Sequence, residues 1–274
     1  MTDRYAVFGN PVRHSKSPLI HATFARETGQ DLTYEAIEAP VDGFAAAVED
    51  FRRNGGRGFN ITTPFKLEAF ALADRRTERA QQAGASNCIK LEPDSITAEN
   101  FDGVGVVNDI ERNQGFVLAG RRVLMLGAGG AARGALIPLL EGRPGALFIA
   151  NRDLAKAQKL RDEFARFGNF EVGGYERLAA LEPFDVVLNA TSASLRNEAP
   201  PVPREAFARD GLAYEMVYGR GLTPFLRVAR QRGVRQLADG VGMLVEQAAE
   251  AFLWWRGVRP ETKGLISQLT VPLT

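Results

Sequence analysis

A glycine-rich turn between two regular segments is the feature that most constrains how this chain folds. Residues 122–126 read as an apolar strand, and the sequence GAGGAARG, from Gly127 to Gly134, follows at once and opens a helical stretch. In a G-x-G-x-x-G/A turn the first glycine permits the tight reversal, the second lets the backbone approach a pyrophosphate, and the third small residue lets the helix pack close to the strand. The helix N-terminus adds free N–H groups and a partial positive charge. An ordinary strand–helix turn is the alternative, but the strand expected next, at 146–150, favours a dinucleotide-binding site.

The rest of the chain alternates short apolar runs with amphipathic stretches, which is typical of βα units in an α/β protein with parallel sheets. Strands are expected at residues 5–9, 32–36, 59–62, 122–126, 146–150 and 184–189. Helices are expected at residues 18–28, 41–54, 65–73, 104–114, 131–140, 154–167, 222–233 and 243–255. A length of 274 residues suggests two domains, and the second section begins near Gly103. The last helix follows the end of that section, so we expect it to return to the first domain.

Charge and cysteine content exclude several classes of protein. The 34 basic and 33 acidic side chains leave a net charge of +1, and no basic block is present, which argues against a nucleic-acid or membrane partner. The single cysteine allows no intrachain disulfide and, with only two histidines, argues against a metal site. The first residues contain no apolar signal core, and no apolar run has the length of a membrane span. We therefore expect a cytoplasmic enzyme or binding protein whose partner is a small molecule.

The residues after the strand at 146–150 indicate which nucleotide is bound. An NAD site usually has an acidic residue there, for the ribose 2′-hydroxyl, whereas here Arg152 follows Asn151 and Lys156 lies one turn further on. A guanidinium can hold a 2′-phosphate through paired hydrogen bonds. Asp153 would repel that phosphate if its carboxylate pointed inward, and the alternative is that both cations are solvated residues at a helix start. The residues that follow this strand therefore favour NADP over NAD.

Two serines precede the first helix, in the turn GNPVRHSKSP. Ser15 and Ser17 lie two residues apart, immediately before Pro18. Hydroxyl groups together with the N–H groups of a helix start are suited to binding a carboxylate. Taken alone, the sequence favours the simpler interpretation, in which Ser17 is the helix N-cap.

Lys66 stands where a helix start would favour an acidic residue. A lysine held in a closed cleft can serve as a general acid or base, although most lysines lie extended on the surface. Asp102, which precedes Gly103, is either a turn residue or the carboxylate that orients Lys66.

Several motifs, read together, resemble the NADP-dependent shikimate dehydrogenases of the shikimate/quinate dehydrogenase family. They are GNPVRHSKSP at 9–18, NITTPFK at 60–66, AGASN at 83–87, FDGVG at 101–105, GAGGAARG at 127–134, NR at 151–152, NATS at 189–192, YEMVY at 214–218 and ADGVGMLVEQAA at 238–249. They run in one order along nearly the whole chain. This resemblance is far more specific than the glycine-rich turn alone.

The resemblance implies a reversible, NADP-dependent reduction of 3-dehydroshikimate to shikimate, a step of aromatic amino acid biosynthesis. It implies an α/β substrate-binding domain at residues 1–103, completed by helices within 242–274, and a Rossmann domain for NADP at residues 104–241. Lys66 is implied as the acid/base, paired with Asp102. The residues implied to bind substrate are Ser15, Ser17, Thr62, Lys66, Asn87, Asp102, Tyr218 and Gln247. The residues implied to bind the cofactor are Glu78, Gly127, Ala128, Gly129, Gly130, Ala131, Asn151, Arg152, Lys156, Ala190, Thr191, Met216 and Gly240.

The chain departs from the family pattern at three places. Phe101 replaces a threonine usual beside the aspartate, Ser192-Ala193-Ser194 replaces a segment that normally continues toward glycine, and Lys156 replaces a common arginine. A phenyl ring at Phe101 would alter both the volume and the polarity of a small polar pocket, so strict specificity for shikimate is open to question. A paralogue acting on quinate or a related hydroxy acid, or a low-turnover NADP-binding protein, stays an alternative. A hydrolase has no support, since no G-x-S-x-G elbow is present. A homodimer is left open.

Overall fold

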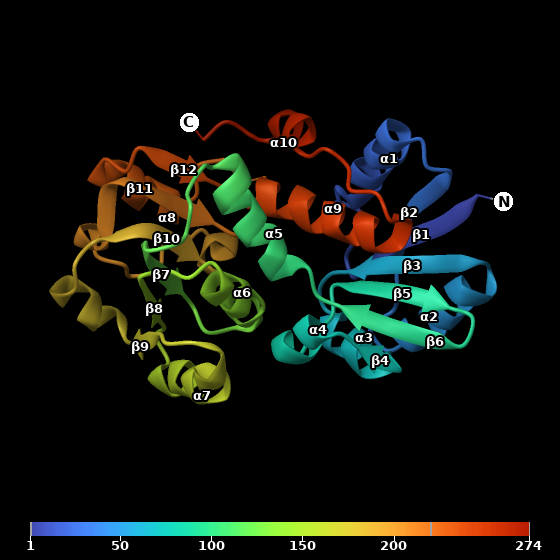
Figure 1. The fold of residues 1–274 in the computed structure, drawn as a ribbon, viewed down its shortest axis with the longest axis horizontal. Helices are drawn as coiled ribbons and strands as arrows, with labels where there is room; N and C mark the ends of the chain where they lie inside the picture. The colour runs from blue at the N-terminus through green and yellow to red at the C-terminus, as the bar shows by residue number, and fades with distance from the viewer. Residues whose placement is uncertain (1, 220, 274) are drawn as a thin grey trace. The chain divides into compact units, whose positions relative to one another are not determined.

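The structure is a computed structural model that describes residues 2–219 and 221–273, and it contains two compact units. Unit 1 comprises Met1–Asp102 and Val245–Leu265, and unit 2 comprises Gly103–Leu244 and Ile266–Thr274. Each unit is built on one six-stranded sheet with helices packed against it (Figure 1). This architecture confirms the α/β fold class. No helix in the described part of the chain is both long enough and apolar enough to cross a membrane.

The sheet of unit 1 is mixed rather than wholly parallel. Its strands are β1 (Asp3–Gly9), β2 (Leu32–Glu38), β3 (Gly56–Ile61), β4 (Arg75–Arg76), β5 (Cys88–Glu92) and β6 (Ser95–Glu99), in the order β2-β1-β3-β5-β6-β4. Strands β1, β2 and β3 are parallel, whereas β5 runs antiparallel to both β3 and β6. The expectation of parallel strands is therefore wrong for this hairpin. Its turn contains Pro93-Asp94, a pair that favours tight reversal of the chain.

An aromatic core fixes the helices of unit 1 on this sheet. The helices are α1 (Ser17–Thr28), α2 (Phe44–Arg53), α3 (Lys66–Leu72), α4 (Glu78–Ala83) and most of α9 (Val241–Arg256). Phe8 of β1 packs against Phe59 of β3 at 4.8 Å and against Phe44 of α2 at 5.9 Å, measured between ring centroids. On α1, Phe24 meets Phe252 of α9 at 5.7 Å. Most of the last long helix thus packs in unit 1.

The sheet of unit 2 is wholly parallel. Its strands are β7 (Arg122–Leu126), β8 (Ala146–Ala150), β9 (Glu171–Gly173), β10 (Phe184–Asn189), β11 (Phe207–Glu215) and β12 (Gln236–Ala238), in the order β12-β11-β10-β7-β8-β9. The chain crosses from the β8 side of β7 to the β10 side, so the strand order reverses at β7. In doubly wound sheets ligands bind outside the carboxyl ends of the strands at this switch point. The glycine-rich turn lies directly after β7.

The helices of unit 2 cover both faces of its sheet. They are α5 (Asp102–Asn108), α6 (Gly130–Glu141), α7 (Leu154–Phe164) and α8 (Pro224–Arg232), and α10 (Lys263–Leu269) follows at the end of the chain. The helix expected at 104–114 is instead α5 followed by a π-helical turn, Asp109–Asn113. The Asp109 carboxylate points inward there and accepts a hydrogen bond of 2.6 Å from the buried Tyr214 hydroxyl.

Candidate functional site

The order of strands in unit 1 brings four loops to one edge of its sheet. The carboxyl ends of β1 and β3 lie at the same edge because these strands are parallel. The amino end of β5 and the carboxyl end of β6 lie there too, because each strand runs antiparallel to its neighbour. The turns before α1 and α3, the residue before β5 and the residues after β6 therefore meet. These loops carry most of the predicted substrate-binding side chains.

Lys66 and Asp102 form an ion pair at this edge. The Lys66 Nζ lies 2.6 Å from Asp102 Oδ2, and their side chains are 36% and 18% exposed. Asn87 Nδ2 donates to Asp102 Oδ1 at 2.7 Å and to Gln247 Oε1 of α9 at 3.1 Å. Both carboxylate oxygens thus have a partner, and Asp102 is held in one orientation while Lys66 stays accessible to solvent. The ammonium form of such a side chain can donate a proton, and its neutral amine form can accept one.

Backbone hydrogen bonds hold the two loops that carry Asn87 and Asp102. The Phe101 N–H donates to Asn87 Oδ1 at 2.8 Å, and the Asp102 N–H donates to Asn100 Oδ1 at 3.0 Å. Asn100 in turn donates to the Ala85 carbonyl at 3.1 Å. Sequence reasoning gave Asn100 no role, although its place in the Asn-Phe-Asp-Gly segment was a usable signal.

Ser17 is a helical residue rather than an N-cap. Helix α1 begins at Ser17, Lys16 occupies the N-cap position, and the Ser17 N–H donates to Ser15 Oγ at 3.2 Å. The N-cap interpretation is therefore wrong. Ser15 performs the capping hydrogen bond, and both serines lie at the sheet edge near the start of α1.

The sequence motifs did not identify a buried layer of side chains beneath this edge. The Tyr34 hydroxyl donates to Asn60 Oδ1 at 2.7 Å, and Asn60 Nδ2 donates to the Asn87 carbonyl at 3.2 Å. The His21 ring stacks on Tyr34 with 4.2 Å between ring centroids. Burial lowers the pKa of His21 to about 3, although a hydrogen bond to Asn60 acts in the opposite direction. Thr62, the residue after β3, is half-buried, and its N–H donates to the Phe8 carbonyl at 2.9 Å.

Phe101 does not form part of an open polar pocket. Its side chain is 3% exposed and lies in a buried cluster with Cys88 and Ala251. The ring meets Trp254 of α9 edge-on at 5.9 Å, and the Arg79 guanidinium lies 5.3 Å from its centre. The ring is thus buried among apolar side chains, and its effect on substrate choice stays a prediction.

Close backbone contacts bring predicted cofactor residues together in unit 2. Gly127 has a φ of +109°, which favours glycine, and an added Cβ would lie 3.1 Å from the Thr191 methyl and 3.2 Å from the Ala190 carbonyl oxygen. At Gly240 an added Cβ would overlap the Met216 carbonyl oxygen. The structure thus pairs the glycine-rich turn with the Ala190–Thr191 turn, and Met216 with Gly240.

The same turn leaves room for an anion at the start of α6. An added Cβ at Gly129 or Gly130 would meet no described atom within 4 Å, and both residues and Ala131 are exposed, while Ala128 is half-buried. Free N–H groups at a helix start bind phosphate well when the backbone can be approached. The geometry fits a pyrophosphate.

The turn after β8 carries two cationic side chains, and its acidic side chain caps the helix that follows. Asp153 caps α7 by accepting from the Lys156 N–H at 3.2 Å, and its carboxylate lies 3.7 Å from Lys156 Nζ. Asn151 Nδ2 donates to the Asp153 carbonyl at 2.8 Å, and Arg152 is exposed. The Asp153 carboxylate therefore does not oppose Arg152. Burial raises the pKa of Tyr175, and the positive charge of Arg152 acts against this rise.

Two predicted residues stand apart from these groupings. Glu78 is exposed at the start of α4 in unit 1 and accepts from Gln82 Nε2 at 2.9 Å. Tyr218 is 40% exposed in unit 2, and partial burial raises its pKa. Their predicted roles stay predictions.

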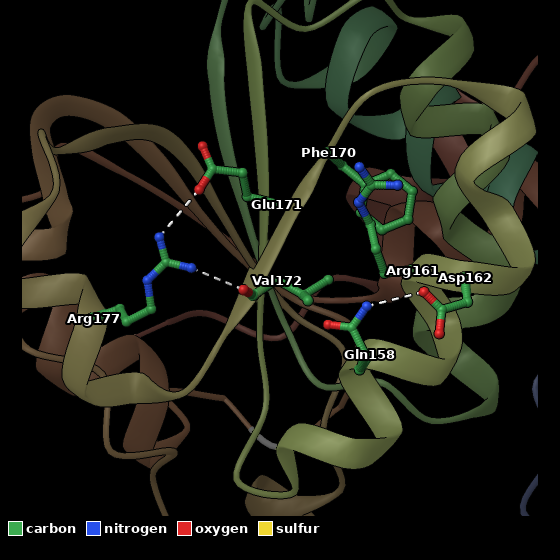
Figure 2. Close-up of a pocket in the computed structure, with 7 residues that line it drawn as sticks. All are labelled: Gln158, Arg161, Asp162, Phe170, Glu171, Val172 and Arg177. Carbon is green, nitrogen blue, oxygen red and sulfur yellow. Dashed lines mark hydrogen bonds and ion pairs between the residues drawn. The ribbon is translucent and has the colours of Figure 1, made fainter.

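A pocket of about 380 Å³ in unit 2, whose lining residues are drawn in Figure 2, contains none of the predicted site residues. It is lined by Gln158, Arg161, Asp162, Phe170, Glu171, Val172 and Arg177. Most of its polar side chains are paired: Arg177 bonds Glu171 and the Val172 carbonyl, and Gln158 bonds Asp162, while Arg161 lies over the Phe170 ring. Within residues 2–219 and 221–273, no group of three or more His, Cys, Asp or Glu side chains is placed to hold a metal ion.

Comparison with known proteins gives matches along the whole chain. The shikimate dehydrogenase substrate-binding domain matches residues 7–89, the shikimate/quinate 5-dehydrogenase domain matches residues 110–198, and the shikimate 5′-dehydrogenase C-terminal domain matches residues 240–269. The NADP(+)-dependent shikimate dehydrogenase of Nitrosospira multiformis is 57% identical over 98% of each chain.

Solved structures agree with these matches. An Ael1 enzyme from Pseudomonas putida is 58% identical over the full length of both chains, with a TM-score of 0.95. Shikimate 5-dehydrogenase from Thermus thermophilus, in complex with NADP(H) and shikimate, is 32% identical over 97% of this chain and 98% of its own, with a TM-score of 0.85. The sequence motifs, the two sheets and these full-length relatives lead to one conclusion: the chain belongs to the shikimate dehydrogenase family.

Proposed function

We propose that this protein is an NADP-dependent shikimate dehydrogenase, which reversibly reduces 3-dehydroshikimate to shikimate in aromatic amino acid biosynthesis. The observation that carries the proposal is the ion pair of 2.6 Å between Lys66 and Asp102, with Asn87 bonded to the second carboxylate oxygen. A protein that only binds its ligands has no need for an oriented acid/base pair. The full-length relatives named as NADP-dependent shikimate dehydrogenases support the same activity.

Lys66 and Asp102 are the proposed catalytic residues. NADPH, when bound, supplies the hydride. During reduction of the substrate ketone, Lys66 donates a proton from Nζ to the ketone oxygen. In the reverse reaction the neutral Lys66 amine accepts that proton. Asp102 holds the ammonium group in place, Asn87 donates a hydrogen bond to Asp102, and Gln247 accepts one from Asn87. Positioning of the ring against the nicotinamide supplies the remaining acceleration.

The substrate carboxylate is assigned to Ser15 and Ser17, at the start of α1. The ring hydroxyls are assigned to Thr62, Lys66, Asn87, Asp102 and Gln247, and Tyr218 is assigned to closing the site. A ring carrying several hydroxyls needs such a set of polar groups, because each unpaired buried hydroxyl lowers affinity.

The cofactor is assigned to the carboxyl edge of the sheet in unit 2. The N–H groups at the start of α6, among Gly127–Ala131, hold the pyrophosphate, and Asn151, Arg152 and Lys156 hold the 2′-phosphate. The residues assigned to the rest of the cofactor are Glu78, Ala190, Thr191, Met216 and Gly240. We accordingly assign the substrate to residues 1–103 with 242–274 and NADP to residues 104–241, and unit 1 and unit 2 provide the sheets for these two roles.

The decisive experiment measures NADPH oxidation in the presence of 3-dehydroshikimate. We expect turnover by the natural protein, and a fall in kcat of about 10²–10⁴-fold in Lys66→Ala with a modest change in KM. Lys159→Ala is the matched control, because Lys159 is 77% exposed on α7 and should leave kcat unchanged. Unaltered turnover in Lys66→Ala would remove Lys66 from the mechanism.

Substrate choice needs its own measurement. Phe101 departs from the family motif, and two relatives of nearly equal identity carry different names. Steady-state rates with shikimate and with quinate, each against NADP and NAD, distinguish a shikimate enzyme from a paralogue that uses a related hydroxy acid. Failure to turn over any of these would favour a low-turnover binding protein.

We assign the protein to the cytoplasm, as the class of enzyme suggests. A homodimer is the assembly to test, by light scattering coupled to size-exclusion chromatography. A mass near 29.9 kDa would identify a monomer.

A further inference from the structure

A buried carboxylate in unit 2 has no role in the proposed mechanism. Glu215, the last residue of β11, is completely buried. Its register partner on the neighbouring strand is Asn189, the last residue of β10. Desolvation raises the pKa of Glu215, although its hydrogen bonds act in the opposite direction. A carboxylate at the carboxyl edge of a Rossmann sheet is close to where a dinucleotide binds.

Hydrogen bonds from four segments converge on this carboxylate. Asn189 Nδ2 donates to both oxygens, at 3.1 and 3.0 Å. The Ser194 hydroxyl donates to Oε2 at 2.5 Å, and the Thr223 hydroxyl, at the start of α8, donates to it at 3.1 Å. The Val217 N–H donates to Oε1 at 3.3 Å. One side chain thus ties together the turn after β10, the short helix that follows it, the turn after β11 and helix α8.

The segments tied in this way carry the residues assigned to the cofactor. Asn189 Oδ1 accepts from the Thr191 N–H at 3.1 Å and from the Thr191 hydroxyl at 2.7 Å. Glu215 therefore sets the orientation of the Asn189 amide, and that amide sets the position of Thr191. Met216 lies between Glu215 and Val217, so its backbone is held on both sides.

Strand order shows which half of the cofactor these segments face. The glycine-rich turn follows β7, and the cations assigned to the 2′-phosphate follow β8, on one side of β7. Strands β10 and β11 lie on the other side of β7. A dinucleotide with its pyrophosphate at the central turn therefore extends its nicotinamide half toward β10 and β11.

We propose that Glu215 is a positioning residue for the nicotinamide half of NADP: its carboxylate holds the Ala190–Thr191 turn and the Met216 backbone in the binding conformation. This inference rests on the proposed use of NADP. It assigns Glu215 no contact with the cofactor and no proton transfer.

Glu215→Gln changes this network with little change in shape. The new amide nitrogen fits best in place of Oε2, where the Ser194 and Thr223 hydroxyls can rotate to accept hydrogen bonds from it. It still faces the Asn189 NH₂ group, so two donors then oppose each other. Asn189 cannot relieve that conflict by rotating its amide without losing the hydrogen bond from the Thr191 N–H and reversing the one from the Thr191 hydroxyl. The disturbance is therefore directed at Thr191.

The test compares two ligands by isothermal titration calorimetry. NADP carries the nicotinamide half, whereas adenosine 2′,5′-bisphosphate carries only the half assigned to Arg152. In Glu215→Gln we expect the Kd for NADP to rise about tenfold, as for the loss of one charge-assisted hydrogen bond, and the Kd for the bisphosphate to stay within twofold. Arg152→Ala is the matched control with the opposite pattern, because it should weaken both ligands.

A Glu215→Gln variant that binds NADP as the natural protein does, or that loses equal affinity for both ligands, would overturn the proposal. If that variant does not fold, Ser194→Ala replaces it, since this change removes one donor and leaves the carboxylate in place. We then expect a smaller rise, about threefold, confined to NADP. Equal affinities in Ser194→Ala and the natural protein would also overturn it. Failure of the natural protein to bind either ligand would instead contradict the proposed function.

Discussion

The two candidate sites of this protein differ in how they hold their functional groups. In unit 1 the chemistry depends on charged side chains: Lys66 is paired with Asp102, and the amide of Asn87 bonds both Asp102 and Gln247. In unit 2 the binding surface is mainly backbone, shaped by Gly127 and the start of α6, and the buried Glu215 is bonded to neutral donors. A site that moves a proton needs titratable side chains, whereas a site that holds a phosphate can use N–H groups.

The two sites also differ in what supports them. Aromatic packing lies beneath the loops of unit 1, where Phe101, Trp254 and the His21–Tyr34 stack are found together with the hydrogen bond from Tyr34 to Asn60. A polar network lies behind the cofactor edge of unit 2. We therefore expect substitutions beneath the first site to affect stability, and substitutions at the edge of the second to affect ligand affinity.

Phe101→Thr should give the largest effect. The threonine would leave a cavity beside Trp254, Cys88 and Ala251, and loss of a buried phenyl ring costs about 3 kcal/mol of unfolding free energy. We expect no gain in kcat/KM for shikimate, because the ring is buried and packs among apolar side chains. Urea denaturation and a steady-state assay check both statements. Phe101→Leu, which keeps most of the apolar volume, should lose much less. Higher activity at unchanged stability would show that the ring reaches the substrate after all.

Arg152→Ala tests the cofactor site of unit 2, where we expect an effect on ligand affinity rather than on stability. Arg152 is exposed, so its removal should leave stability nearly unchanged. Loss of a charge-assisted contact to the 2′-phosphate costs about 1.5–3 kcal/mol, which corresponds to about 10- to 100-fold in the Kd for NADPH. NADH lacks that phosphate and should lose little. Equal losses for both cofactors, measured by fluorescence titration, would mean that Arg152 does not contact the 2′-phosphate.

His21→Phe tests the buried layer beneath the first site through the pH dependence of the unfolding free energy. The pKa of His21 is lowered to about 3 in the folded protein, against 6.5 for the exposed side chain. The unfolded chain therefore binds a proton below pH 6.5 that the folded chain does not bind until about pH 3, and stability falls progressively between these values. Between pH 7 and pH 5 this loss amounts to about 2 kcal/mol.

The phenylalanine variant has no proton to bind and packs among the same aromatic rings. Its unfolding free energy should therefore fall less than that of the natural protein, by about 2 kcal/mol, when urea titrations at pH 7 and pH 5 are compared. Parallel pH dependence in the two proteins would show that His21 is hydrated or paired when folded.

Much of the architecture could be predicted because it is encoded locally. The strand, turn and helix around Gly127 follow from residues adjacent in sequence, and strands β7, β8 and β10 begin and end where the apolar runs do. The hairpin of β5 and β6 was missed. Pro93-Asp94 was a local signal for its turn, but its place in the sheet depends on pairing with β3, which lies far away in the sequence.

The residues of the candidate active site divide in the same way between those that local motifs indicate and those that tertiary contacts define. The motifs alone named Lys66, Asn87 and Asp102 as members of one site, because each stands in a segment typical of the family. Tyr34 and Asn60 were not found, because their roles arise from hydrogen bonds to residues far along the chain. Asn100 was overlooked although it accepts a hydrogen bond from Asp102, two residues away. The direction of Phe101 was equally undetermined, since a side chain after a strand can face either the loop edge or the helix behind it.

The sequence by itself determined the fold class, the family and the residue types at each site, since these depend on local pattern and composition. Only the tertiary structure decided which partners those residues have: Asp153 caps a helix, Ser15 rather than Ser17 makes the capping bond at α1, and Glu215 joins four segments. The physical reason is that hydrogen-bond partners and burial are set by segments distant in sequence that pack together, and the free energy of those contacts exists only once the chain has folded.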